Sequence, residues 1–340
     1  MTSFTRRTFL AAAPALAQPP ARKINIAFLG AAHSHAEGKI AAVRANPAFS
    51  LAGIVEDDPK YRARYEAAGL PLLPREKVLS DPSIEVIAVE SEVKRHARDG
   101  FAALNAGKHV HLEKPPADNM AETRTVIETA RRKQRLLQLG YMWRHHPGMN
   151  LMLDAARQGW LGDIYLIKGM MNTLITAEQR PEWNLFPGGQ MFEQGCHLLD
   201  PIVRLLGRPA RISSVLKTSG DFKDTLKDNA VAVLEYPRAV AVISTAVLQP
   251  AANPYRCLEI FGTSGTAVLR PIEQPVLEID LAKPAGPYKA GRQKVDLPPF
   301  RRYEGDFAEL ARCVTEHKPL SVTLEQEFLL QQVLLEASHM

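Results

Sequence analysis

The chain has 340 residues, of which 46% are hydrophobic and 23% are charged, and its formal net charge is +5. This length predicts about two domains, and the composition is that of a globular protein. The charge is too small and too evenly spread to indicate a nucleic-acid-binding protein. The three cysteines, Cys196, Cys257 and Cys313, lack CxxC spacing. They therefore form neither a disulfide framework nor a zinc site, and we expect them to be small buried residues.

Residues 1–17 have the order of features found in an export signal. Arg6 and Arg7 lie in a segment that resembles the twin-arginine signature, and a short apolar run ends in Ala15-Leu16-Ala17. The run is too short to span a membrane, and no other stretch is long and apolar enough to do so. We expect a periplasmic or secreted protein without a membrane span. The alternative is a disordered tail on a cytoplasmic protein.

Residues 23–140 alternate between short apolar runs and helical patterns. The predicted strands span residues 23–30, 50–55, 84–89, 109–112 and 136–140, and the predicted helices span residues 35–46, 59–68, 97–107 and 119–133. Strict alternation with short links predicts βαβ units and a parallel sheet. Because such sheets bind ligands beyond the carboxyl ends of their strands, the residues that follow each strand are the site candidates.

The loop after the first strand keeps only part of the dinucleotide-binding fingerprint. Of the three glycines in GxGxxG, only Gly30 is present, and Ala32 stands at the second position. Taken alone, this loop is weak support for a nucleotide site. His33 and His35 lie where the nicotinamide or pyrophosphate would pass, so we expect them to contact cofactor or substrate.

Glu56 ends the second strand and is the acidic residue that a dinucleotide site needs. A carboxylate at this point accepts hydrogen bonds from the adenosine ribose hydroxyls. It would repel a 2′-phosphate, which favours NAD over NADP. The alternative is that Glu56 caps the helix that begins near Pro59.

The segment Ala103–Pro116, with Glu113-Lys114-Pro115 near its end, resembles the "ALxAGKHVxxEKP" motif of the Gfo/Idh/MocA family (glucose–fructose oxidoreductase, inositol dehydrogenase and rhizopine catabolism proteins). The resemblance implies an α/β fold with two domains. A Rossmann domain with a doubly wound parallel sheet would cover residues 23–144. An α+β domain with an open, mostly antiparallel sheet would cover residues 145–340, bind substrate and mediate homo-oligomer formation.

Residues 187–200 give a second match, because they are similar to the family's "GGxxxDxGxHxxD" helix, with Glu193 in place of the first Asp. Glu193, His197, Asp200 and Arg204 recur at intervals of four, three and four, so a regular helix places them on one face. A surface ladder of ion pairs is the alternative for such a polar stripe. The resemblance and Gly195 within the helix favour an active site.

Two smaller matches and one departure complete the resemblance. Residues 140–147 are similar to the family's "GyxxRxxP" segment, which implies that Arg144 lies near substrate or nicotinamide. Residues 262–267 are similar to a "GtxGtl" turn, whose glycines we expect to have positive φ. Family members usually have a Thr-Pro-Asn-type loop after the third strand, where this chain has Glu90-Ser91-Glu92-Val93. Two carboxylates beside the cofactor phosphates are unfavourable unless they point away.

The resemblance implies an NAD(P)-dependent oxidoreductase that oxidises or reduces a secondary hydroxyl or carbonyl of a sugar, polyol or inositol. His197 would be the general acid/base, Lys114 would stabilise the reacting oxygen, and Glu193 would orient His197 or bind a neighbouring hydroxyl. Asp200 would support the helix or hold His197. One alternative is a glycosidase that oxidises its substrate transiently and retains NAD, which would suit an exported enzyme. Another is a non-catalytic sugar-binding protein.

The predicted sites contain no metal. The pairs His33/His35 and His109/His111 invite a metal hypothesis, but they follow different strands, and the family needs no metal for its chemistry. We expect substrate to be bound by Lys114, Arg144, Glu193 and His197. We expect NAD to be bound by Gly30, Ala32, His33, His35, Glu56, Glu113, Lys114 and Arg144.

Overall fold

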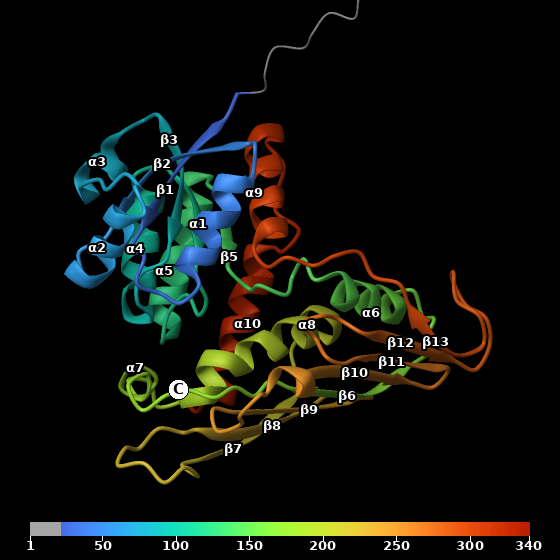
Figure 1. Cartoon of the computed structure of the whole chain (residues 1–340). Coiled ribbons are helices and arrows are strands. Elements are labelled where there is room, and N and C mark those ends of the chain that lie inside the picture. Colours follow the sequence, from blue (N-terminus) through green and yellow to red (C-terminus); the bar gives the residue numbers. More distant parts are fainter. Residues whose placement is uncertain (1–21) are drawn as a thin grey trace, which may run out of the picture.

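The computed structural model describes residues 22–340, which form two domains stacked on each other (Figure 1). The predicted export signal lies outside the described residues. The first domain is built on a parallel sheet and the second on a large sheet that is mostly antiparallel. The α/β fold expected from the sequence is therefore confirmed.

The first sheet has five parallel strands in the order β2-β1-β3-β4-β5. The strand order reverses between β1 and β3, so the loops after these two strands open onto one crevice. Every predicted strand and helix of this domain is present, and the short helix α3 is an addition. The strands are β1 (Ile24–Leu29), β2 (Phe49–Val55), β3 (Ile84–Val89), β4 (His109–Leu112) and β5 (Leu137–Leu139), and the helices are α1 (Ala36–Ala45), α2 (Pro59–Ala67), α3 (Arg75–Ser80), α4 (Val93–Asn105) and α5 (Met120–Lys133).

Gly30, directly after β1, is required by the backbone at this point. Its φ is +78°, and a Cβ atom added to it would lie 2.5 Å from the Cα atom of Ser91, in the loop after β3. Only glycine adopts this conformation readily, and only glycine lets the two loops come so close. The first glycine of the fingerprint therefore sets the crevice between β1 and β3.

The second sheet has eight strands in the order β13-β12-β11-β10-β6-β9-β8-β7, and only β6 and β9 pair in parallel. Helices α6 and α8 lie against one face, and Figure 1 shows the opposite face open. The strands are β6 (Ile164–Met170), β7 (Arg211–Lys217), β8 (Asn229–Glu235), β9 (Val240–Ala246), β10 (Cys257–Gly262), β11 (Gly265–Leu269), β12 (Leu277–Leu281) and β13 (Gly291–Val295). The helices are α6 (Pro147–Arg157), α7 (Arg180–Trp183), the π-helix η1 (Met191–Gly195), α8 (Cys196–Leu206) and the 3-10 turn η2 (Asn253–Tyr255).

The last two helices connect the domains. Helix α9 (Glu304–Glu316) packs against α1 of the first domain, and α10 (Leu324–Ala337) packs against both α5 and α8. Helix α10 begins at a capping box, in which Thr323 accepts from the backbone N–H of Gln326 and the Gln326 side chain accepts from the backbone N–H of Thr323. The C-terminal part of the chain thus returns to the Rossmann domain and holds it over the second sheet.

The turn between β10 and β11 differs from expectation. Neither Gly262 nor Gly265 has positive φ, so that prediction was wrong. A Cβ atom on Gly262 would lie 2.1 Å from the carbonyl oxygen of Leu161, and one on Gly265 would lie 2.5 Å from Leu281. Glycine is needed here because neighbouring chain segments approach closely. The positive φ belongs to Gly162, across the contact.

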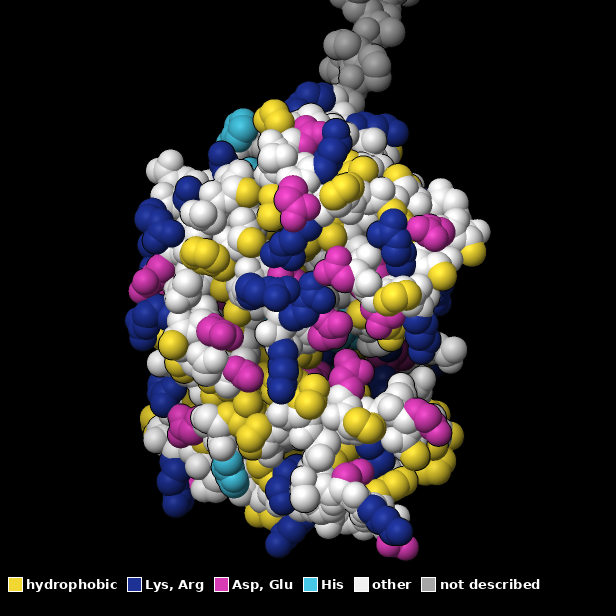
Figure 2. All heavy atoms as spheres, turned by 90° about the vertical axis from the view of Figure 1, so that its left-hand side faces the viewer, with side chains coloured by type: hydrophobic (Ala, Val, Ile, Leu, Met, Phe, Trp, Pro, Cys, Tyr) yellow, Lys and Arg dark blue, Asp and Glu magenta, His cyan; other side chains and the backbone are white. Residues whose placement is uncertain are grey.

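The described surface and interior agree with the composition. Cys196, Cys257 and Cys313 are buried and unpaired, as expected. Within residues 22–340, no helix has the length and apolar character to cross a membrane. On the face drawn in Figure 2, Lys and Arg side chains are interspersed with Asp and Glu side chains, without a large area of one sign.

Candidate active site

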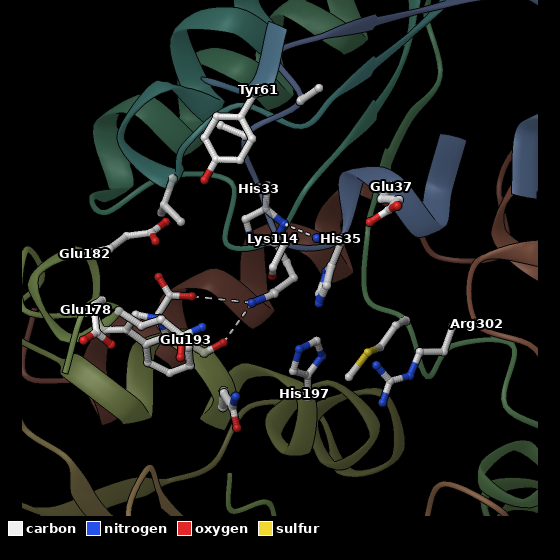
Figure 3. Close-up of a pocket in the computed structure, with 18 of the residues that line it drawn as sticks. His33, His35, Glu37, Tyr61, Lys114, Glu178, Glu182, Glu193, His197 and Arg302 are labelled. Atoms are coloured by element: carbon white, nitrogen blue, oxygen red, sulfur yellow. Dashed lines mark hydrogen bonds and ion pairs between the residues drawn. The ribbon is translucent and has the colours of Figure 1, made fainter. Parts of the chain in front are cut away.

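A cavity of about 600 Å³ lies between the two domains, where the crevice beyond β1 and β3 faces the second sheet's helices (Figure 3). This volume is within the range of small-molecule and cofactor sites. Both domains contribute to its wall, so neither forms the site alone. The first domain supplies Ala31, Ala32, His33, Ser34, His35, Glu37, Lys60, Tyr61, Arg64, Tyr65, Val93 and Lys114, and other wall residues include Met142, Met171, Glu178, Gln179, Glu182, Trp183, Glu193, Gln194, His197, Arg256 and Arg302.

Lys114 reaches into this cavity from the end of β4. Its Nζ donates to the backbone carbonyl of Glu193 at 2.9 Å and lies 3.5 Å from the Glu193 carboxylate (Figure 3). Burial alone would lower the pKa of Lys114, but the carboxylates of Glu193 and Glu113 raise it above its ordinary value. Lys114 therefore stays an ammonium group that can stabilise negative charge on a substrate oxygen.

The π-helix η1 and the start of α8 place Glu193 and His197 on the opposite wall. A regular helix was expected here. The wider π turn at Met191–Gly195 changes the register before α8, and π turns of this kind are frequent at functional sites. Burial raises the pKa of Glu193 and lowers that of His197 well below its usual range. His197 is thus a neutral imidazole, and its Nδ1 is buried with no hydrogen-bond partner among the described residues.

Neither Glu193 nor Asp200 holds the imidazole of His197, and the other role expected for Glu193, binding a neighbouring hydroxyl, stays a prediction. Glu193 pairs with Lys114 rather than with the imidazole of His197. The Asp200 carboxylate accepts from Arg144 at 2.9 and 3.0 Å and lies 3.5 Å from Arg204. Asp200 therefore supports helix α8, which is one of the two roles expected for it.

Arg144 does not line the cavity, so its predicted place beside substrate or nicotinamide is wrong. Its guanidinium group lies between the carboxylates of Asp200 and Glu327 and over the ring of Tyr141, and only 6% of the side chain is exposed. Two buried carboxylates use its donors. Arg144 joins α8 to α10 and acts in the structure rather than in binding.

A buried charge network lies behind the loop that follows β1. The Lys39 ammonium donates to Glu90 at 2.7 Å and also to Glu113, and all three side chains are fully buried. Burial raises the pKa of Glu90; Glu113 remains a carboxylate because Lys39 holds its pKa well below the usual range despite burial. The Glu90 side chain is thus held by Lys39 away from the cavity wall, while the second acid of this loop, Glu92, lies 3.4 Å from Arg95.

His35 connects this network to the cavity. Its Nδ1 lies 3.2 Å from the second oxygen of Glu113, and its ring lines the cavity wall. Sequence reasoning found His35 and Glu113 but missed Lys39, although Lys39 stands one helical turn after His35 in the predicted helix. The signal that could have identified Lys39 was its position on a helix face expected to be buried, because a buried ammonium group needs acidic partners.

Glu56 binds the glycine loop. Its carboxylate accepts from the backbone N–H of Ala31 at 2.7 Å and from that of Asp58 at 2.9 Å. The alternative of a helix cap is wrong, because Asp58 is the N-cap of α2 and accepts from Lys60. Glu56 is buried beside the start of the loop, and its contact with an adenosine ribose stays a prediction.

One group of side chains has the spacing of a cation site. Ligand atoms of His33, His35 and Glu113 all lie within 4.8 Å of one another. However, the Glu113 carboxylate already pairs with the Lys39 ammonium, and His33 Nδ1 accepts from the backbone N–H of His35 at 3.3 Å. Because the Lys39 ammonium already supplies a positive charge to the Glu113 carboxylate, we do not identify a metal site here.

Helix α7 and the segment before it form a part of the wall that the sequence did not reveal. Glu178, Glu182 and Trp183 line the cavity from this segment, and Figure 3 labels the two carboxylates. Arg180, buried beneath, holds the segment by pairing with Asp224 and Asp228. Carboxylates and an indole ring are groups that bind the hydroxyls and the apolar face of a sugar ring.

Comparison with known families identifies both domains. Residues 24–141 match a family model described as "Oxidoreductase family, NAD-binding Rossmann fold". Residues 150–268 match one described as "GFO/IDH/MocA C-terminal domain". The two matches meet near the end of β5 and cover most of the described chain.

Curated relatives include dehydrogenases of cyclic alcohols. A trans-1,2-dihydrobenzene-1,2-diol dehydrogenase from Bos taurus is 28% identical over 197 residues, which are 57% of this chain and 57% of that protein. A scyllo-inositol 2-dehydrogenase (NADP(+)) from Bacillus subtilis (strain 168) is 25% identical over 182 residues, 53% of this chain and 50% of that protein. The chain thus spans about half the length of the curated relatives it matches.

Solved structures share the whole architecture at low identity. A levoglucosan dehydrogenase in complex with NADH and levoglucosan is 18% identical with a TM-score of 0.79, over 94% of this chain and 98% of that chain. An aldose-aldose oxidoreductase from Caulobacter crescentus is 20% identical with the same TM-score, over 94% of this chain and 98% of that chain. At these identities the likeness shows the common fold.

Proposed function

We propose that this chain, which belongs to the Gfo/Idh/MocA oxidoreductase family, oxidises or reduces a secondary hydroxyl or carbonyl of a sugar, polyol or inositol with a nicotinamide dinucleotide. The observation that carries the proposal is the single cavity that joins the loop after β1 to Lys114, Glu193 and His197. The cofactor's place and the charged groups for alcohol chemistry share this space. The dehydrogenase activities of the relatives support the same substrate class.

The residues of the first domain fit a dinucleotide. The backbone N–H groups of Ala31, His33 and His35 are taken by the protein, but those of Ala32 and Ser34 have no partner within the described chain and lie in the loop that leads into the N-terminus of α1. Free N–H groups at a helix start are suited to a pyrophosphate. Lys60 adds positive charge on the α2 side of the cavity.

We assign NAD rather than NADP as the cofactor. Glu56 and Asp57 follow β2, and the Glu56 carboxylate is fixed beside the loop by two backbone donors. A 2′-phosphate in this position would meet negative charge. Lys60 and Arg64 are close in sequence, but Arg64 already pairs with Glu37.

The nicotinamide, when bound, supplies the hydride acceptor. Lys114 then lies where its permanent positive charge stabilises the developing alkoxide. His197 contacts the same oxygen as a neutral imidazole, and the Glu193 carboxylate binds a neighbouring hydroxyl and orients Lys114. Glu178, Glu182 and Trp183 hold the rest of the ring.

A retained-cofactor glycosidase is the second candidate. The observation that favours it is a second imidazole, His35, on the cavity wall in addition to His197, since transient oxidation followed by elimination needs more than one acid–base group. Accumulation of NADH with a free sugar or inositol supports the dehydrogenase. Release of an aglycone without net NADH supports the glycosidase.

The first test is to denature the purified protein, to identify any released dinucleotide, and to titrate the folded protein with NAD and NADP. We expect NAD to be released or to bind more tightly than NADP. If no dinucleotide is released and neither NAD nor NADP binds, the redox assignment is contradicted.

The second test is a panel of aldoses, polyols and inositols, with NADH absorbance as the signal. Lys114→Ala and His197→Ala should each abolish turnover, while the circular dichroism spectrum stays unchanged. Full activity in either variant would contradict the assigned roles, and a variant that loses its fold would be replaced by Lys114→Met or His197→Phe.

We further propose that the protein is exported by the twin-arginine route and forms homo-oligomers through the open face of the second sheet. Residues 1–17 support the first proposal by their order of arginines, apolar run and small-residue end. Exposed apolar residues on the open face, among them Val215 and Val231, support the second.

A further inference from the structure

Two imidazoles, His35 and His197, reach the cavity from opposite domains, with the Lys114 ammonium near both (Figure 3). An alcohol oxidation needs one group that takes the hydroxyl proton. The resemblance of residues 187–200 to a family helix would give this role to His197. The contacts behind the two rings favour the other histidine.

His35 is backed by a carboxylate that is itself fixed. Its Nδ1 lies 3.2 Å from Glu113, and Lys39 binds the other oxygen of Glu113. Since Glu113 stays ionised, it accepts the Nδ1–H proton of the ring and sets the tautomer. The lone pair of the ring then lies on Nε2, the nitrogen that Figure 3 shows turned toward His197. A carboxylate behind an imidazole also stabilises the imidazolium that forms when the ring takes a proton.

His197 has no such support. Its Nδ1 is buried without a hydrogen-bond partner among the described residues, and its ring neighbours are Trp143 at 5.5 Å and Tyr141 at 6.2 Å between centroids. A positive charge on this ring would be buried beside Lys114 without a carboxylate in contact. His197 is therefore suited to a neutral hydrogen bond rather than to carrying a proton.

We propose that His35, oriented by Glu113, is the catalytic residue that accepts the substrate's hydroxyl proton, and that His197 is a neutral hydrogen-bond partner of the same oxygen. This inference rests on the proposed dehydrogenase function. In the oxidation, the C–H bond pair leaves the substrate carbon as hydride for the nicotinamide. The O–H bond pair becomes the second bond of the carbonyl, and the proton passes to His35 Nε2. The imidazolium then returns the proton to solvent at the cavity mouth, where the side chain is 16% exposed.

The charged and titratable groups around His35 set its working pH range. His33 packs edge-on at 4.7 Å, Tyr303 lies at 5.6 Å, and Glu113, Lys39, Lys114 and His197 complete the surroundings. Burial lowers the pKa of His35, and Glu113 opposes this through its charge and hydrogen bond. Because only the neutral ring accepts a proton, the oxidation rate should rise with pH through a midpoint below about pH 6.5 and then level off.

The first experiment needs no substrate. Nitrogen NMR of the histidine-labelled protein reports which ring nitrogen of His35 carries the proton, with His35→Gln used to assign the signal. We expect Nδ1–H in the wild type, and in Glu113→Gln a midpoint of the His35 titration at lower pH. Lys39 keeps Glu90 as a partner in that variant, so it is not left unpaired. A His35 ring protonated on Nε2 in the wild type would overturn the proposal, whether or not the protein turns out to be a dehydrogenase.

The second experiment measures NAD reduction against pH with a substrate from the panel. In the wild type, the rate should rise with pH along an acid limb and then reach a plateau. His35→Gln should lower the plateau rate by at least about 100-fold and remove the acid limb. Glu113→Gln should move the limb to lower pH and slow the plateau, because a weaker base accepts the proton less readily. His197→Gln should lower the rate but keep the limb where it is. His145→Gln is the matched control, since His145 lies 3.5 Å from Glu309 in a histidine–glutamate pair that does not line the cavity.

Binding of NAD separates this inference from the proposed function. Equal NAD affinity in the wild type and in His35→Gln, with the rate loss above, supports a proton acceptor. Weaker NAD binding in His35→Gln with an unchanged limb would make His35 a cofactor contact and overturn the proposal. Loss of the limb in His197→Gln alone would return the role to His197. A wild type that binds no NAD would instead contradict the proposed function itself.

Discussion

Single residues of this protein take their roles from the charges buried next to them. Lys39 pairs with both Glu90 and Glu113, and burial raises the pKa of Glu90 to about 8, so the one cation balances the one ionised acid, Glu113, behind the cavity. Lys114 is likewise kept charged by Glu193, while His197 has no acid in contact. The same residue types at other spacings would have different protonation states. Motif residues in this family therefore need to be considered together with the groups behind them.

Arg144 provides a test of this principle at the scale of one residue. Arg144→Leu should lower the free energy of unfolding by about 3–5 kcal/mol, because Asp200 and Glu327 would remain buried without their shared cation. Urea denaturation followed by circular dichroism measures the change. The matched control is Arg211→Leu, which removes an exposed ion pair with Glu235 and should stay close to the wild type. An equal loss of stability in both variants would contradict the larger contribution expected from the buried group of Arg144, Asp200 and Glu327.

The elements that carry the site are irregular where they meet the cavity. The loop after β1 turns at Gly30, and the helix opposite begins with the π turn at Met191–Gly195. These two irregular segments bring His35 and His197 to one space from different domains. Regular helices and strands elsewhere hold the two segments in place.

The turn between β10 and β11 gives a prediction at the scale of elements. Gly262→Ala should destabilise the protein by about 1–3 kcal/mol, since its methyl group would collide with the Leu161 carbonyl. Gly159→Ala is the contrasting variant, because Gly159 has φ +72° but no atom within 4 Å of an added Cβ. If the contact rather than φ matters at Gly262, its variant shows the larger shift in thermal unfolding. A larger shift for Gly159→Ala would contradict that explanation.

At the scale of the whole molecule, the site depends on two domains held at a fixed distance. Helix α10 packs on α5 of the first domain and on α8 of the second. The buried ion pair between Arg144 and Glu327 connects α10 to the segment that follows β5. The open face of the second sheet carries a group of exposed or half-buried valines on β7, β8 and β9. Val215 pairs with Val231 across β7 and β8 on this face, and Val233, Val240 and Val242 continue it.

We expect this face to form the subunit contact. Val231→Lys combined with Val233→Lys should convert an oligomer into a monomer, because two buried charges oppose association without touching the core. Size-exclusion chromatography with light scattering measures the change. Tyr165→Lys is the control, as Tyr165 is an exposed apolar residue of the same sheet whose position alternates with the open face. A wild-type protein that is monomeric, or a double variant that remains oligomeric, would contradict the proposed contact.

The sequence alone predicted the fold and the site residues that lie in continuous motifs. Alternating apolar runs predicted all five strands of the first sheet because each buried parallel strand is read from local hydrophobicity alone. Continuous motifs located Lys114, Glu193 and His197 for the same reason, since each motif is local. Arg144 was placed wrongly, and Lys39 was missed, because ion pairing joins residues that are far apart in the chain. Only the tertiary structure showed that Arg144 lies between Asp200 and Glu327, that Lys39 fixes Glu113, and that Glu113 supports His35 while nothing comparable supports His197. Protonation and partner choice depend on distances in space, and these are set by how the two domains pack.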